Sequence, residues 1–248
     1  MQATSGSCGA ECGARRLPSA NPRQGKRELE SAVHRVRVLA NIAPPQFRER
    51  NLPMPRLTPP PEAHVTQAYG VYVLSTAHRD VRRLRKVSDP VAHGTKTWGA
   101  SYLLMDYLLE HPLRRGSHVL EVGCGWAPAG IFCAKQFKAR VTGTDLDGKV
   151  FPYMHLMANL NDVRIAALER SFQTLTRADL KTVNTVIGSD ICFWPSLVEP
   201  LVGMTRRALD AGVERVIITD PGRAPFYKLC EKLSAVPRFK VQIGRAHV

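Results

Sequence analysis

From residue 117 onward the chain switches regularly between two apolar periods. Short apolar runs of strand length are separated by longer segments whose apolar residues recur at helical spacing. The runs are HVLEV, ARVTGTD, VRIAALE, NTVIGSD, ERVIITD and FKVQ. This pattern predicts an α/β fold, a doubly wound and mostly parallel sheet covered by helices on both faces. Ligands bind such sheets at the carboxyl ends of the strands, so functional residues are sought there.

The intervening segments carry helix boundary signals. We expect helices over YLLMDYLLEH (ending near His111), PAGIFCAKQF, GKVFPYMHLMANL, SLVEPLVGMTRRALDAG and PFYKLCEKLSAV. Pro128 suits the first position of its helix, where no backbone N–H is needed. Gly212 is suited to closing another helix.

Composition divides the chain into four parts. Residues 1–30 are small, polar and Arg-rich without periodicity, and residues 51–64 hold five prolines, so we expect 1–60 to be a disordered, basic and proline-rich N-terminal extension. Residues 61–111 are a segment and helix expected to cover a cofactor pocket, and residues 112–242 form the core. The last six residues, IGRAHV (243–248), are what one frame of a common sequencing adapter encodes. We therefore expect 243–248 to be an artefact and the C-terminal strands to be truncated.

The 248 residues carry a formal net charge of +14, and no apolar run approaches bilayer length. The N-terminus has no apolar signal core. The six cysteines form no CxxC pair and none lies at ligand spacing from a histidine, so we expect no metal site. Reduced thiols favour a cytoplasmic protein that does not associate with a membrane. If residues 1–30 are instead a transit peptide, the protein is organellar.

One dense basic cluster, HRDVRRLRK (78–86), lies outside the N-terminal extension. It is a candidate for contact with nucleic acid, but the chain has no RNP, zinc-finger or KH signature. A solvated helix face is the favoured interpretation of this segment.

The stretch VLEVGCGWAPAG (119–130) is a strand followed by a glycine turn. A dinucleotide site needs G-x-G-x-x-G. Gly123 and Gly125 fit the first two positions, but Pro128 occupies the third. Glu121 places a carboxylate where a diphosphate would sit, which favours a cationic, phosphate-free ligand.

These residues resemble motif I of the class I, seven-strand methyltransferases, which have a Rossmann-like fold. Asp145 ends the second strand, where that family has its ribose-binding acid, and Asp190 ends the fourth. The resemblance implies S-adenosylmethionine as the cofactor. Its expected binding residues are Trp98, Glu121, Gly123, Gly125, Asp145 and Asp190.

Two further segments resemble the protein lysine methyltransferases of methyltransferase family 16. KTWGASYLLMDYL (96–108) is similar to the segment that precedes motif I in that group, and its Trp98 is expected to line the cofactor pocket. GSDICFW (188–194) is similar to the group's D-x-x-Y motif, with phenylalanine in place of tyrosine. The resemblance implies Asp190 and Phe193 as catalytic residues. Phe193 and Trp194 are expected to bind the substrate, since ring faces attract an ammonium group.

The resulting hypothesis is an S-adenosylmethionine-dependent N-methyltransferase that acts on a lysine side chain of a protein substrate. The same fold acting on a small molecule or on RNA is the first alternative. A non-catalytic binding module that retains the pocket is the second.

Overall fold

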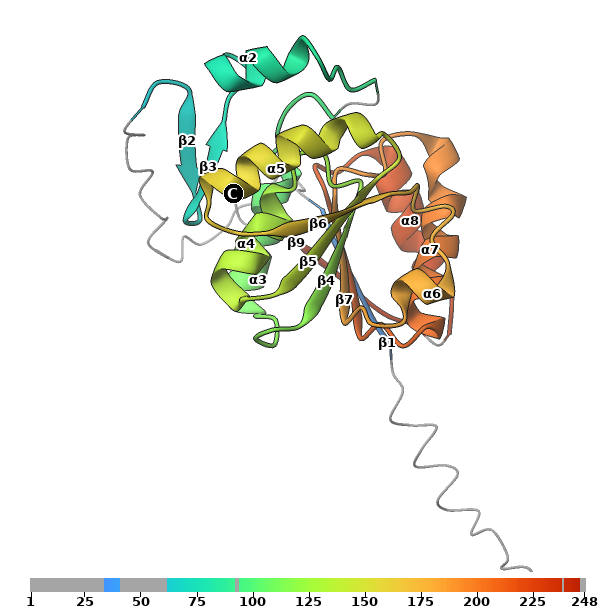
Figure 1. Ribbon diagram of the computed structural model, residues 1–248. Coiled ribbons are helices and arrows are strands. Elements are labelled where there is room, and N and C mark those ends of the chain that lie inside the picture. Colours follow the sequence, from blue (N-terminus) through green and yellow to red (C-terminus); the bar gives the residue numbers. More distant parts are fainter. Residues whose placement is uncertain (1–33, 41–61, 92–93, 238, 246–248) are drawn as a thin grey trace, which may run out of the picture. The chain divides into compact units, whose positions relative to one another are not determined.

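The computed structural model describes residues 34–40, 62–91, 94–237 and 239–245. Its centre is a seven-stranded sheet in the order β6-β5-β4-β7-β8-β1-β9, and every neighbouring pair is parallel (Figure 1). The strands are β1 (His34–Ala40), β4 (His118–Val122), β5 (Arg140–Asp145), β6 (Ile165–Glu169), β7 (Thr185–Ser189), β8 (Arg215–Asp220) and β9 (Phe239–Arg245). The parallel α/β fold predicted from the sequence is confirmed.

The central strands are apolar along their length because helices cover them on both faces. β4, β7 and β8 have nearly every side chain buried. β4 pairs with β5 on one side and with β7 on the other, so the strand order reverses at β4. The crevice beyond the carboxyl ends of the strands at this reversal is where open α/β sheets bind ligands.

Two helical layers cover the sheet, one on each face (Figure 1). One layer holds α3 (Ala100–Glu110), α4 (Pro128–Phe137), the short η1 (Gly148–Val150) and α5 (Phe151–Leu160). The other holds α6 (Arg177–Leu180), the short η2 (Pro195–Leu197), α7 (Val198–Asp210) and α8 (Ala224–Ser234). Pro128 begins α4 and Gly212, at φ +97°, follows α7, as the sequence predicts.

A small hairpin and a helix pack on the first layer. The hairpin consists of β2 (Val65–Ala68) and β3 (Val71–Leu74), and α2 (Arg79–Arg85) follows it. The Asn161 side chain fastens the hairpin to the end of α5. Its Oδ1 accepts from the Tyr72 N–H at 2.8 Å and its Nδ2 donates to the Tyr72 carbonyl at 2.7 Å.

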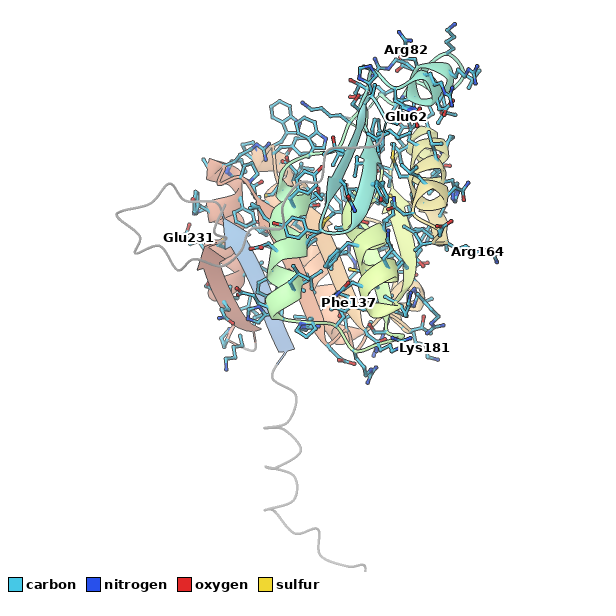
Figure 2. The ribbon with its side chains drawn as sticks, turned by 90° about the vertical axis from the view of Figure 1, so that its left-hand side faces the viewer. Glu62, Arg82, Phe137, Arg164, Lys181 and Glu231 are labelled. Carbon is cyan, nitrogen blue, oxygen red and sulfur yellow. The ribbon has the colours of Figure 1, made fainter. Side chains whose placement is uncertain are left out.

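The basic cluster 78–86 lies on and around α2. Its arginines are exposed, and Arg82 extends away from the ribbon in Figure 2. Asp80 offsets part of the charge, since its carboxylate lies 3.6 Å from the Arg83 guanidinium.

The expectation that all of residues 1–60 are disordered is wrong for His34–Ala40. This segment forms β1 and fills the position between β8 and β9. Arg35, Val36, Arg37 and Val38 alternate at the two-residue period of a strand, a local signal that the basic, proline-rich composition of the surrounding residues obscured. The partner strands lie about 180 and 205 residues further along the chain. The rest of 1–60 lies outside the described residues. β9 reaches Arg245, so part of the segment 243–248 pairs with β1, but its artefactual origin and the truncation of the sheet stay predictions.

Candidate active site

The glycine turn after β4 has a backbone that only glycine adopts easily. Gly123 and Gly125 have φ of +60° and +50°, in the left-handed region. A Cβ on Gly123 would come within 2.7 Å of Ile191 Cγ2, so the turn is also packed too closely for a side chain there. A Cβ on Gly125 would meet no protein atom within 4 Å, and this residue lines a cavity. At Gly123 and Gly125 the turn therefore presents backbone to the cavity, and Cys124 and Trp126 also belong to the lining.

Glu121 lies behind this turn rather than in the cavity. Its side chain is buried, and Oε2 accepts a hydrogen bond from the Gly130 N–H in the first turn of α4 at 2.8 Å. Burial raises the pKa of Glu121 to about 8, while the bond from Gly130 opposes the shift. The expectation that Glu121 places a carboxylate where a diphosphate would sit is wrong, because its side chain faces the interior and bonds to the first turn of α4. Its role as a cofactor contact stays a prediction that the geometry does not favour.

Asp145 ends β5 and lines the cavity beside the turn. Its Oδ2 accepts from the Gly125 N–H at 3.1 Å, and its Oδ1 accepts from the Asp147 N–H at 3.2 Å. Burial raises the pKa of Asp145, and these backbone bonds act in the opposite direction. The carboxylate is thus fixed in place with acceptor capacity to spare for a ligand's hydroxyl groups.

The cavity lies at the carboxyl edge of the sheet. It is lined by six of the eight predicted site residues: Trp98, Gly123, Gly125, Asp145, Asp190 and Phe193. Glu121 and Trp194 are not part of the lining. The sequence did not indicate the wall formed by Arg170, Ser171 and Phe172 after β6, since no motif marks it.

Trp98 reaches the cavity from the start of α3. The Ser101 hydroxyl donates to the Trp98 carbonyl at 2.6 Å, and the Thr219 hydroxyl on β8 donates to the Ala100 carbonyl at 2.7 Å. The Lys96 ammonium lies 4.4 Å from the centroid of the indole ring. These contacts hold the residues around Trp98 against the carboxyl ends of the strands, where the cavity lies.

Asp190, directly after β7, has a constrained backbone. Its φ is +60°, which is uncommon for a residue other than glycine, and its N–H donates to the Thr219 carbonyl at 2.8 Å. Backbone in sparsely populated conformations is often found at functional sites, where surrounding contacts hold it.

An arginine not assigned to the site pairs with Asp190. One guanidinium nitrogen of Arg223 contacts Asp190 Oδ1 and also lies 3.0 Å from Asp220 Oδ2. The other oxygen of Asp220 accepts from the N–H groups of Gly222 and Arg223, both at 2.8 Å. Burial lowers the pKa of Arg223, but the two carboxylates outweigh it and raise the pKa overall. The adjacency of β7 and β8, read from the sheet order, is the signal that would have suggested this ion triad.

The two aromatic residues after Asp190 lie in different environments. Phe193 lines the cavity, and its ring centroid is 5.9 Å from that of Trp194, with the ring planes at 67°. The Trp194 side chain is 55% exposed. Phe193 thus forms part of the wall, and Trp194 next to it is exposed to solvent.

No group of three or more His, Cys, Asp or Glu side chains is placed to hold a metal ion within the described ranges. None of the helices in this part of the chain is long and apolar enough to cross a membrane.

The fold is that of a class I methyltransferase. A family profile described as lysine methyltransferase matches residues 84–223, which is more than half of the chain. The chain therefore belongs to this lysine methyltransferase family, whose members depend on S-adenosylmethionine, and the predicted family and cofactor are confirmed.

Individual relatives are distant. The chain is 27% identical over 130 residues to an electron transfer flavoprotein β subunit lysine methyltransferase of Xenopus laevis, and the match covers 52% of each chain. It thus spans about half the length of that curated relative. Among solved structures, an rRNA methylase of Streptococcus thermophilus is similar with a TM-score of 0.46 and 14% identity, over 57% of this chain and 82% of the other. TYW2 of P. horikoshii in complex with MeSAdo has a TM-score of 0.37 and 12% identity, over 56% and 46% of the two chains.

Proposed function

We propose that this chain binds S-adenosylmethionine in the cavity beside the glycine turn and transfers a methyl group to a lysine side chain of a protein. The observation that carries the proposal is the arrangement of one cavity. Gly125 and Asp145 line it on one side, and Asp190 and Phe193 line it on the other. Family membership supports the cofactor and the acceptor class.

The residues present fit the cofactor. A carboxylate with spare acceptor capacity, Asp145, is suited to ribose hydroxyl groups. Gly125 leaves the backbone accessible where a Cβ would project away from protein atoms. Trp98 and Phe172 contribute apolar walls for the uncharged parts of the ligand. When bound, the cofactor supplies a methyl group on a positively charged sulfur.

The other side of the cavity is suited to orient an amine. Asp190 Oδ1 is engaged by Arg223, and its second oxygen has acceptor capacity for an amine N–H. A lysine has an intrinsic pKa of about 10.4 and must lose a proton before it can attack. The Arg223 guanidinium on the same carboxylate disfavours a second cation there, so it favours the neutral amine. Phe193 and Trp98 exclude water from the reacting groups.

The decisive test is the fate of a radiolabelled methyl group. The purified protein is incubated with labelled S-adenosylmethionine and either purified electron transfer flavoprotein β subunit or a lysate divided into protein, RNA and small-molecule fractions. The β subunit is chosen because the curated relative is named for it. We expect label in a protease-sensitive fraction and methyl-lysine by mass spectrometry.

Other outcomes select the alternatives. Label only in RNA or only in small molecules would overturn the lysine acceptor. Binding of the cofactor with no transfer to any fraction would indicate a binding module.

We also propose a cytoplasmic location. Cys124, Cys133, Cys192 and Cys230 are free thiols, as expected in a reducing compartment. Fractionation of cells that express the tagged protein tests this, and recovery with organelles would overturn it.

A further inference from the structure

The loop between β6 and α6 forms one wall of the cavity, and both of its ends are anchored. At its start, the Arg170 N–H donates to the Asp145 carbonyl at 2.8 Å, and the Arg170 guanidinium lies 2.8 Å from Asp179. At its end, Thr176 and Asp179 form a reciprocal capping box that begins α6. The cavity-lining residues Ser171 and Phe172 lie between these anchors.

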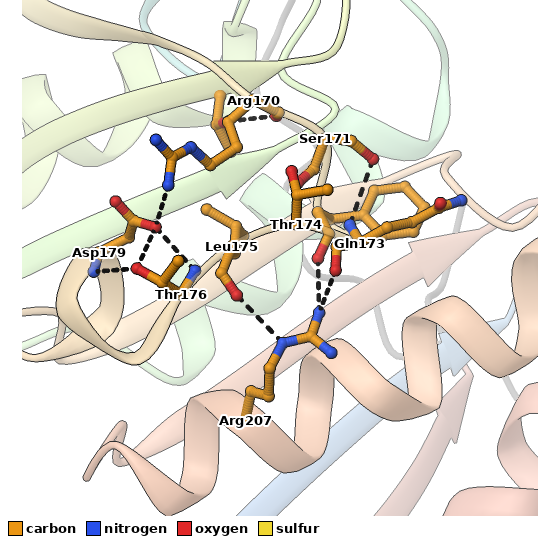
Figure 3. A network of polar contacts seen from close by, with 10 residues as sticks. Arg170, Ser171, Gln173, Thr174, Leu175, Thr176, Asp179 and Arg207 are labelled. Carbon is orange, nitrogen blue, oxygen red and sulfur yellow. Dashed lines mark hydrogen bonds and ion pairs between the residues drawn. The ribbon is translucent and has the colours of Figure 1, made fainter.

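The middle of this loop is held from outside the cavity by one side chain on α7. Arg207 Nε donates to the Leu175 carbonyl at 3.1 Å, and its Nη2 donates to the carbonyls of Phe172 and Gln173, both at 2.9 Å (Figure 3). The planar guanidinium group thus donates hydrogen bonds to three backbone carbonyls of one turn. A single ammonium cannot reproduce this fork of donors.

The helix also makes room for this guanidinium. Gly203 lies one turn before Arg207, and a Cβ there would come within 3.3 Å of Arg207 Nη1. Glycine inside a helix is unfavourable compared with alanine, so its presence at this position calls for a local reason. Within the described ranges Arg207 forms no ion pair with a carboxylate, and its hydrogen bonds go to the loop.

We propose that Arg207 is a positioning residue that holds the Ser171–Phe172 wall in the shape that binds the cofactor. The inference rests on the proposed use of S-adenosylmethionine. Arg207 does not line the cavity, so it acts through the loop backbone. Leu175 is almost fully buried and keeps the end of the loop attached to the core. Loss of Arg207 therefore loosens the Phe172–Gln173 turn without detaching the whole loop.

The test measures binding of S-adenosylhomocysteine by calorimetry and amide hydrogen exchange in the loop. The variants are Arg207→Met, which keeps length and removes the donors, and Arg207→Lys, which keeps the charge. Arg206→Met is the matched control, because Arg206 is the exposed neighbour on the same helix. Circular dichroism and thermal melting report whether each variant folds.

We expect Arg207→Met to weaken S-adenosylhomocysteine binding by about tenfold, the effect of losing bonds from a charged donor. Exchange at the amides of residues 172–175 should rise in the same variant. Arg207→Lys should lie between it and the wild type, and Arg206→Met should match the wild type. If Arg207→Met does not fold, weaker binding by a normally folded Arg207→Lys supports the same conclusion.

Two failures are distinguishable. Unchanged affinity in folded Arg207 variants, with the wild type binding normally, would overturn the positioning role and leave the proposed function intact. Absence of binding by the wild type would overturn the proposed function and, with it, this inference.

Discussion

The two sides of the cavity are built in different ways. The side with Gly123, Gly125 and Asp145 is fixed by backbone conformation and by bonds between a carboxylate and backbone N–H groups. The side with Asp190 is fixed by an ion triad with Arg223 and Asp220, and next to it Trp194 is exposed to solvent. Both sides join residues from two paired strands, but the first is held by bonds to backbone N–H groups and the second by an ion triad of side chains.

The two arrangements suit two different functions, binding of a cofactor and binding of an acceptor. A cofactor of constant shape is suited to a preformed site whose geometry the backbone sets. An acceptor on another protein needs charge and apolar surface that are accessible from solvent. Substitutions on the two sides should therefore have different consequences for cofactor binding, methyl transfer and stability.

The largest expected effect is on transfer alone, in Asp190→Asn. Asparagine tolerates the positive φ of this position, but it lacks the negative charge. We expect the rate of methyl transfer to fall about a thousandfold, as when a group that stabilises a transition state is removed. The measurement is transfer of radiolabel to the acceptor protein, with S-adenosylhomocysteine binding measured in parallel. If binding falls by the same factor, Asp190 serves the cofactor only.

A pair of glycine variants tests the cofactor side. Gly123→Ala and Gly116→Ala both place alanine at positive φ, at a cost of roughly 1–2 kcal/mol each. Only the Cβ at 123 meets Ile191, at 2.7 Å, and nothing lies within 4 Å of a Cβ at 116. We expect Gly123→Ala to lose about 2 kcal/mol more free energy of unfolding than Gly116→Ala.

Chemical denaturation measures that difference, and calorimetry should show loss of S-adenosylhomocysteine binding only in Gly123→Ala. Equal destabilisation of the two variants would contradict the close packing at the turn.

The ion triad is tested by Arg223→Met with Arg223→Lys as the control. Removing the guanidinium leaves the carboxylates of Asp190 and Asp220 facing each other without a cation. The Arg223 side chain is 33% exposed, so we expect a loss of about 1.5 kcal/mol, less than for a fully buried pair. Arg223→Lys should recover part of this loss in chemical denaturation. A methionine variant as stable as the wild type would show that the triad does not stabilise the site.

The smallest effect concerns Glu121 and pH. Its folded pKa of about 8 lies above the ordinary value of 4.5, so between these pH values the folded state holds a proton that the unfolded state releases. The stability due to this group is present below about pH 4.5 and is lost as the pH rises toward 8. Between pH 6 and 7 we expect the wild type to lose on the order of 1 kcal/mol more than Glu121→Gln. Parallel pH profiles of the free energy of unfolding would show that Glu121 is ionised in the folded protein.

The cofactor side could be predicted from the sequence because its signals are local. A strand, two glycines at a turn, a helix-starting proline and an acid after the next strand all lie within 27 residues of each other, from 119 to 145. The orientation of Glu121 could not be predicted, because a carboxylate two residues before the turn can face either the ligand or the helix. Packing of α4 onto β4 brings the Gly130 N–H within hydrogen-bond distance of the Glu121 carboxyl group, and this contact orients Glu121 toward the helix.

The contacts of the acceptor side and the position of β1 in the sheet could not be predicted from local sequence signals. Asp190 and Arg223 are 33 residues apart, and only the pairing of β7 with β8 brings them into contact. Arg207 and the loop carbonyls that it bonds after β6 are likewise more than thirty residues apart in the sequence. β1 joins the sheet next to a strand about 180 residues later in the chain.

The sequence by itself determined the alternation of strands and helices, the glycine turn and the candidate acids at the strand ends. Each follows from the conformational preferences of neighbouring residues. Only the tertiary structure decided which acids face the cavity, which arginine neutralises Asp190 and where β1 pairs. Those outcomes depend on burial and on contacts between distant segments, whose energies no local stretch of sequence contains.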